Sequence, residues 1–222
     1  MKPFIKKEDF NFIKKCITDL HGTLRNCTDP NIIETNKAYI NEKILSRFSE
    51  LSNEEKELID INKITDPLHI DKYLEDLNEY EYVYGMTAIK SNAITKLFRK
   101  EKKLKIPNLD FESSKKVYLG WIDEGSRKLF IAYNLNGKLT GMACKIPSYN
   151  SSNNHICTLC NHIGNDTEVA FVSALCKTSN PEQGTYRSIG FDICLDSEKC
   201  NERITSTDKL EKLLKDVNNI KK

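Results

Sequence analysis

Four cysteines in the second half of the chain constrain its fold more than any other feature. Cys157 and Cys160 form a Cys-x-x-Cys pair, and Cys194 and Cys200 form a second pair with five residues between them. Two thiolates at the first spacing can bind one metal ion from a tight turn, in which backbone N–H groups hydrogen-bond to the sulfurs. The second spacing is wider than usual, yet the two pairs together supply a tetrahedral set of ligands. We therefore predict one structural Zn²⁺ ion bound by these four side chains.

The sequence around the cysteines predicts a treble-clef zinc finger. Residues 168–176 and 189–193 are typical of two paired strands between the cysteine pairs. A short helix is expected after Cys200, with its apolar stripe at Leu210, Leu213, Leu214 and Val217. The order of turn, hairpin and helix is that of a treble clef. A closed set of four thiolates leaves no coordination position for a substrate, so we expect a structural site and no enzyme.

Other assignments of these residues stay open. A Cys-x-x-Cys pair is also found in thioredoxin-like redox sites, although no βαβ pattern surrounds this one. Cys176 can replace a member of the second pair, and His155 and His162 flank the first pair and are possible ligands. Cys16 and Cys144 lie within apolar patterns, which favours packing in the core.

Composition limits the classes of protein to consider. The 222 residues suit one or two domains, and 39% hydrophobic with 30% charged residues is typical of a soluble globular protein. The formal net charge of +2 does not require a nucleic-acid partner. The sequence contains no apolar run that could span a bilayer, and its start, MKPFIKKEDF, lacks the pattern of a secretory signal. We expect a cytoplasmic protein with no membrane partner, in which a reducing environment disfavours disulfides.

The first hundred residues have the pattern of a helical bundle. Apolar residues recur at helical spacing between Phe12 and Leu24. Helix starts are indicated at Asp29-Pro30, at Ser52 with Glu55, at Asp66-Pro67 and at Ser91. Four or five helices with short connections favour a bundle.

The pattern changes after Pro107. Strands are predicted over residues 117–122, 129–133 and 139–146, and Asn136-Gly137 predicts a tight hairpin between the last two. We therefore predict an α+β protein, with a helical bundle over residues 1–105 and an α/β domain with the treble clef over residues 106–222.

A basic segment at the end of the last predicted helix provides an alternative function. Its cations are Lys96, Arg99, Lys100, Lys102, Lys103 and Lys105. They favour either a solvated helix end or a surface that faces RNA or an acidic protein. The alternative is thus an RNA- or ribosome-binding zinc protein that uses a basic helix over residues 96–105.

The sequence lacks recognisable catalytic motifs. It contains no G-x-S-x-G, no phosphate-binding loop and no H-E-x-x-H. The zinc deaminases need H-x-E before the cysteines, whereas His155 is followed by Ile156 and Cys157.

A series of motifs resembles a known family. In order they are KKLKIP (Lys102–Pro107), YLGW (Tyr118–Trp121), RKLFIAY (Arg127–Tyr133), CTLC (Cys157–Cys160), GTY (Gly184–Tyr186) and GFDICLDSEKCN (Gly190–Asn201). From residue 97 to residue 214 the chain resembles the FusB-type fusidic acid resistance proteins, which bind elongation factor G in Gram-positive bacteria. Both cysteine pairs have the family's separation.

The resemblance implies a function beyond what the residues show. It implies a C-terminal domain that binds elongation factor G and helps to release it from ribosomes stalled by fusidic acid. We expect elongation factor G as the partner and the ribosome as a further one, no small-molecule substrate, and a monomer. The residues beside the ligands or on the last helix are the candidate contacts: Ile156, Arg187, Phe191 and Leu213. Phe191 is the preferred anchor, because aromatic residues dominate the energetics of interfaces.

Overall fold

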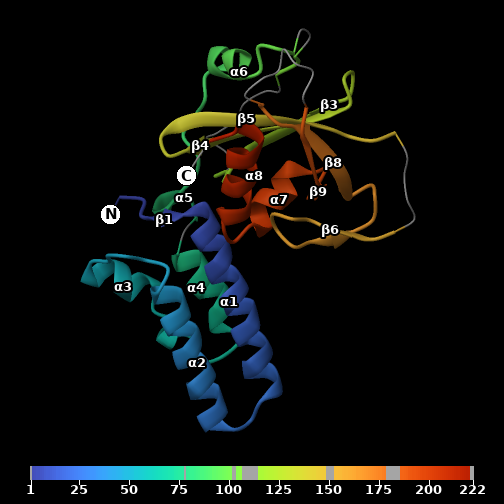
Figure 1. Cartoon of the computed structure of the whole chain (residues 1–222). Helices are drawn as coiled ribbons and strands as arrows, with labels where there is room; N and C mark the ends of the chain where they lie inside the picture. Colours follow the sequence, from blue (N-terminus) through green and yellow to red (C-terminus); the bar gives the residue numbers. More distant parts are fainter. Residues whose placement is uncertain are drawn as a thin grey trace. The chain divides into compact units, whose positions relative to one another are not determined.

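The chain folds into two compact units, residues 1–84 and residues 85–222 (Figure 1). The computed structural model describes residues 2–77, 79–101, 104–106, 115–148, 153–178 and 186–220. The first unit is helical, and the second combines a sheet with helices. The predicted α+β fold class, with a helical N-terminal region and a treble clef in the second unit, is therefore confirmed.

The first unit contains helices close to those predicted before residue 85, together with a 3-10 helix and a one-turn helix that the sequence did not predict. They are α1 (Lys7–Asn26), α2 (Pro30–Leu45), α3 (Asn53–Ile59), a 3-10 helix (Ile61–Lys63), α4 (His69–Asp76) and α5 (Glu79–Tyr82). The Asp29 carboxylate caps α2 by accepting a hydrogen bond from Asn31 N at 2.9 Å. Ser52 and Glu55 make the predicted capping box, because each side chain accepts a hydrogen bond from the other residue's backbone N–H.

One apolar core holds this unit together. Ile13, Ile17 and Leu20 of α1 are fully buried against residues of α2 such as Ile44. A short parallel pair, β1 (Ile5–Lys6) with β2 (Val83–Tyr84), lies at the two ends of the unit's sequence. The sequence does not predict this pair, because two-residue strands show no periodicity.

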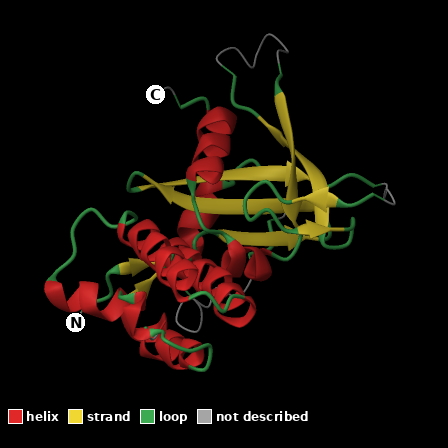
Figure 2. Ribbon diagram, turned by 90° about the horizontal axis from the view of Figure 1, so that it is seen from below, coloured by secondary structure: helices red, strands yellow, loops and turns green. Residues whose placement is uncertain are grey.

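The second unit contains a five-stranded antiparallel sheet in the order β3-β4-β5-β8-β9 (Figure 2). The strands are β3 (Leu119–Asp123), β4 (Lys128–Leu135), β5 (Lys138–Lys145), β8 (Val169–Leu175) and β9 (Ser188–Cys194). The predicted hairpin joins β4 to β5: Asn136 and Gly137 both have positive φ, 51° and 79°. That geometry matches the right-handed twist of the strands.

One face of this sheet is covered by α6 (Ser91–Leu97). Trp121 stacks on Phe130 with ring centroids 5.1 Å apart, and Phe98 meets both rings edge-on. Ile94 of α6 is fully buried in the same cluster. Trp121 is thus a core residue, as its apolar strand indicates.

The packing of α6 explains why the boundary lies earlier than the sequence indicates. The predicted domains, 1–105 and 106–222, assign α6 to the bundle, whereas the units divide after Tyr84. The change in hydrophobic period near Pro107 marks the approach to the first strand. The division between units depends instead on which core a helix packs against.

The opposite face of the sheet carries the larger core. It lies under α7 (Ser197–Arg203) and α8 (Asp208–Asn218), and Leu210 and Leu214 of α8 are fully buried in it. Figure 1 shows α6 and α8 on opposite sides of the sheet. Across the described ranges, the helices are all too short or too polar to cross a bilayer.

Candidate metal centre

The first cysteine pair lies in a tight turn between two short strands, β6 (His155–Ile156) and β7 (Ile163–Gly164). Cys157 N donates a hydrogen bond to His162 O at 2.8 Å, and Asn161 N donates one to Cys157 O at 2.9 Å. Asn161 has a φ of 59°, a left-handed conformation that asparagine tolerates better than most residues. This closed turn holds Cys157 and Cys160 close enough to share one ion.

The second pair joins a strand to a helix. Cys194 is the last residue of β9, and Cys200 lies in α7. Between them, the Asp196 side chain caps the helix by accepting a hydrogen bond from Lys199 N at 3.1 Å. The five-residue gap is therefore the length needed to leave the sheet and complete the first turn of α7.

The four sulfurs form a compact cluster. All of them lie within 4.8 Å of one another, with 3.9 Å between Cys157 and Cys200 and 3.6 Å between Cys160 and Cys194. Ligands of a tetrahedral Zn²⁺ ion with Zn–S bonds of 2.3 Å are separated by about 3.8 Å, so the cluster fits such an ion. All eight cysteines lie within the described residues, and none forms a disulfide.

The charges of the cluster also favour a bound cation. Hydrogen bonds from Cys160, Cys194 and Cys200 lower the pKa of the Cys157 thiol. Conversely, the hydrogen bond to Cys157 raises the pKa of the Cys200 thiol, because it stabilises the protonated donor, and the charge of Cys157 raises it further. Without a cation, four thiolates would therefore repel one another in a largely buried site. A divalent ion removes that repulsion.

The alternative ligands lie outside this cluster. The two ring nitrogens of His155 each contact a carboxylate oxygen at 2.9 Å, Nδ1 that of Asp192 and Nε2 that of Asp166. His162 Nε2 lies 3.8 Å from a carboxylate oxygen of Glu168. Cys176, which directly follows β8, is also not part of the group.

Comparisons with known proteins agree with this geometry. Residues 4–87 match the family model described as "Elongation factor G-binding protein, N-terminal", and residues 89–220 match the "FBP C-terminal treble-clef zinc-finger". The chain belongs to the FusB-type family of elongation factor G-binding proteins.

A solved structure adds to this assignment. The chain is similar to the fusidic acid resistance protein FusC, with a TM-score of 0.75 and 27% identity over 96% of this chain and 97% of that one. A search of curated proteins found no match. The resemblance seen in the sequence is confirmed, and the two matched ranges meet close to the division between the two units.

Of the candidate contacts, Ile156 directly precedes the predicted ligand Cys157 and is exposed. It is 57% exposed and pairs across the small hairpin with Ile163, which is 61% exposed. Arg187 is also exposed, whereas Leu213 is half-buried against the large core. Sequence reasoning missed Ile163, whose position opposite Ile156 depends on the turn.

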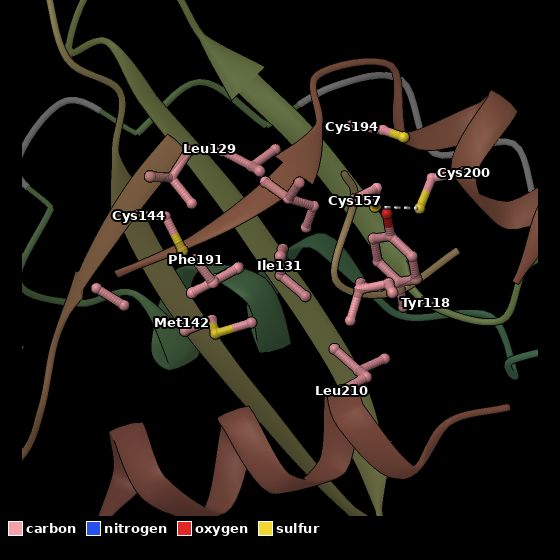
Figure 3. Close-up of a cluster of buried hydrophobic side chains, with 14 of the residues drawn as sticks. Tyr118, Leu129, Ile131, Met142, Cys144, Cys157, Phe191, Cys194, Cys200 and Leu210 are labelled. Carbon is pink, nitrogen blue, oxygen red and sulfur yellow. Dashed lines mark hydrogen bonds between the residues drawn. The ribbon is translucent and has the colours of Figure 1, made fainter. Parts of the chain in front are cut away.

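On sequence grounds Phe191 is the preferred contact with the partner, but the structure places it in the core. It is only 7% exposed and packs in the core with Met142 and Ile131 (Figure 3). On the paired strands themselves, the exposed aromatic residue is Phe171 of β8, which is 44% exposed, and Tyr186 before β9 is 81% exposed. The Phe171 ring lies over Gly190, where a Cβ atom would clash with it.

The basic segment differs from the predicted basic helix over residues 96–105. Helix α6 ends at Leu97, so among the described cations only Lys96 is helical. Arg99, Lys100 and Lys105 are exposed beyond it, and Lys102 and Lys103 lie outside the described residues. Much of the GTY motif, Gly184 and Thr185, also lies outside them.

Proposed function

We propose that the second unit binds one structural Zn²⁺ ion through Cys157, Cys160, Cys194 and Cys200. The observation that carries the proposal is the cluster of four sulfurs at tetrahedral spacing, within a chain whose family model is a treble-clef zinc finger. All ligand positions of this ion are filled by the protein, so its role is to hold the turn, β9 and α7 together rather than to activate a substrate.

The protein acts by binding elongation factor G in the cytoplasm. By analogy with its family, binding promotes release of the factor from ribosomes stalled by fusidic acid, and this release gives resistance to the drug. A metal-held turn loses little conformational entropy when it docks, which suits a binding surface. Ile156 and Ile163 supply exposed apolar area beside that turn, and Arg187 and Leu213 remain proposed contacts.

Calorimetry with purified elongation factor G tests the binding surface. We expect Ile156→Asp to abolish or strongly weaken binding without loss of zinc, because it places a charge in an apolar contact. Ile32→Asp is the matched control: Ile32 is 55% exposed but lies in the first unit, and its substitution should leave affinity unchanged. Equal affinity of both variants and the wild type would show that the surface around Ile156 does not contact elongation factor G.

A second experiment tests release. Ribosomes carrying elongation factor G and fusidic acid are pelleted with and without the protein, and the factor in the supernatant is measured. We expect the wild-type protein to increase that fraction and Ile156→Asp to have little effect. Binding of the free factor without any release from ribosomes would limit the function to binding.

A further inference from the structure

The side chain of Tyr118 is fully buried, and its hydroxyl oxygen has no conventional hydrogen-bond partner among the described residues. Tyr118 directly precedes β3 and belongs to the core cluster under α7 and α8. A buried tyrosine usually has a partner for its hydroxyl, because an unsatisfied polar group in the core is unfavourable. The environment of this hydroxyl therefore indicates what it binds.

The hydroxyl points at the sulfur cluster. Figure 3 shows it beside the sulfurs of Cys157 and Cys200, which lie 3.9 Å apart. Burial raises the pKa of the Tyr118 phenol, and the neighbouring Cys200 and Cys157 raise it further, whereas the Ser197 hydroxyl lowers it. A phenol is neutral at neutral pH and can donate one hydrogen bond, whereas a thiolate can only accept one. The two groups are therefore complementary once the cysteines are ionised.

Asn201, the residue after Cys200, fixes the backbone of Tyr118. Its side-chain oxygen accepts hydrogen bonds from Val117 N at 2.7 Å and from Tyr118 N at 3.0 Å. Its side-chain nitrogen donates to Tyr118 O at 3.0 Å. Asn201 is itself buried, and the same nitrogen donates to Ser197 O at 2.8 Å within α7. Through Asn201, helix α7, which also carries Cys200, is hydrogen-bonded to the backbone of Tyr118.

Gly120 permits this close approach. A Cβ atom at Gly120 would lie 2.9 Å from the Tyr118 ring and closer still to the Ser197 side chain. Any larger residue would push α7 away from Tyr118. The Tyr118–Trp121 motif, YLGW, thus contributes both the phenol and the space that α7 needs beside it.

We propose that Tyr118 is a positioning residue of the metal centre, whose hydroxyl donates a hydrogen bond to a ligand thiolate of the Cys157–Cys200 pair while Asn201 holds it in place. The inference rests on the proposed zinc site. A donor beside a ligand sulfur disperses its charge and fixes its orientation. Loss of such a donor typically lowers metal affinity by roughly 10–100-fold. The hydrogen bond also links the ion directly to the first strand of the sheet.

The test compares Tyr118→Phe, which removes one oxygen atom, with Tyr133→Phe. Tyr133 is the control because its hydroxyl donates to Glu211 at 3.1 Å and not to the cluster. Zinc affinity is measured by competition with a chelator such as EDTA. We expect Tyr118→Phe to lower zinc affinity by about 10–100-fold and Tyr133→Phe to leave it at the wild-type value.

Cobalt substitution supplies a readout that a general loss of stability would not produce. Loss of a hydrogen bond raises the energy of the sulfur electrons, so the sulfur-to-cobalt charge-transfer band of Tyr118→Phe should shift to lower energy. An unchanged band together with unchanged zinc affinity would overturn the proposal. A wild-type protein that binds no zinc would instead overturn the proposed metal site itself.

If Tyr118→Phe does not fold, the wild-type protein still decides the question. In the zinc-loaded protein, NMR should show that the phenol proton assigned to Tyr118 is strongly protected from exchange with water, like that of Tyr73, whose buried hydroxyl donates to Ile59 O at 2.8 Å in the first unit. A Tyr118 phenol proton that exchanges at the rate of exposed tyrosines would contradict the hydrogen bond.

Discussion

The hydrophobic cores of the two units of this protein differ in composition. The first unit packs aliphatic side chains from neighbouring helices, such as Ile17 and Ile44, and its described residues include no group that could hold a metal ion. In the second unit, Cys157 and Cys200 are fully buried members of the same core as the sheet and α8. Burial of apolar area stabilises the first unit. In the second unit, a bound cation is also needed to neutralise the charge of the thiolates. We therefore expect the two units to respond differently to metal removal and to core substitutions.

Removal of a ligand should have the largest effect. Cys200→Ser should abolish zinc binding and unfold or loosen the second unit, because structural zinc contributes roughly 10–16 kcal/mol in zinc-finger peptides. Hydrogen exchange should show lost protection in the second unit and retained protection in the helices of the first. Cys176→Ser, outside the cluster, is the control and should keep zinc. Equal loss of protection in both units would contradict the contrast between them.

Phe191 and Phe171 separate packing from binding within the β8–β9 hairpin. Phe191→Ala should lower the free energy of unfolding of the second unit by about 3–5 kcal/mol, since it empties a core position. Phe171→Ala removes a half-exposed ring and should change that free energy by only about 0.5 kcal/mol. Urea unfolding of both variants with zinc present measures the difference. Similar stabilities for the two variants would show that Phe191 is not a core residue.

A core substitution in the first unit should act without the metal. Ile17→Ala is expected to destabilise this unit by about 2–5 kcal/mol, because a fully buried side chain is truncated. Zinc content and chelator competition should match the wild type. A large loss of zinc in this variant would mean that the metal centre depends on the first unit's core.

The smallest effect is expected at a helix cap. Ser52→Ala removes the hydroxyl that accepts a hydrogen bond from Glu55 N at 3.2 Å and should cost about 1 kcal/mol in the first unit. Ser49→Ala, an exposed serine just before it, is the control. Thermal unfolding of the two variants should show a lower midpoint for Ser52→Ala alone.

Local patterns in the sequence predicted much of the fold and the cysteine cluster. The caps at Asp29 and Ser52 and the turn at Asn136-Gly137 are decided by a few neighbouring residues, and the structure confirms them. The cysteine pairs were recognisable because ligand spacing is itself a local property, and the structure brings all four sulfurs together.

What the sequence could not show depends on contacts between distant segments. Alternation places Phe191 and Asp192 on opposite faces of β9, but which face is buried depends on the helices that cover the sheet. The role of Tyr118 was hidden for the same reason, because its partners Cys200 and Asn201 lie far along the chain. The unit boundary likewise depends on the packing of α6 rather than on its helical pattern.

Binding of elongation factor G as a function of zinc tests most directly whether the metal-held second unit is the binding surface. Calorimetry would compare the protein as purified, the same protein stripped by a chelator, and the stripped protein after zinc is restored. We expect one zinc ion per chain, binding by the purified protein, loss of binding on stripping, and recovery on restoration. Undiminished binding by the stripped protein, or a purified protein that holds no zinc yet binds the factor, would contradict this role of the metal-held unit.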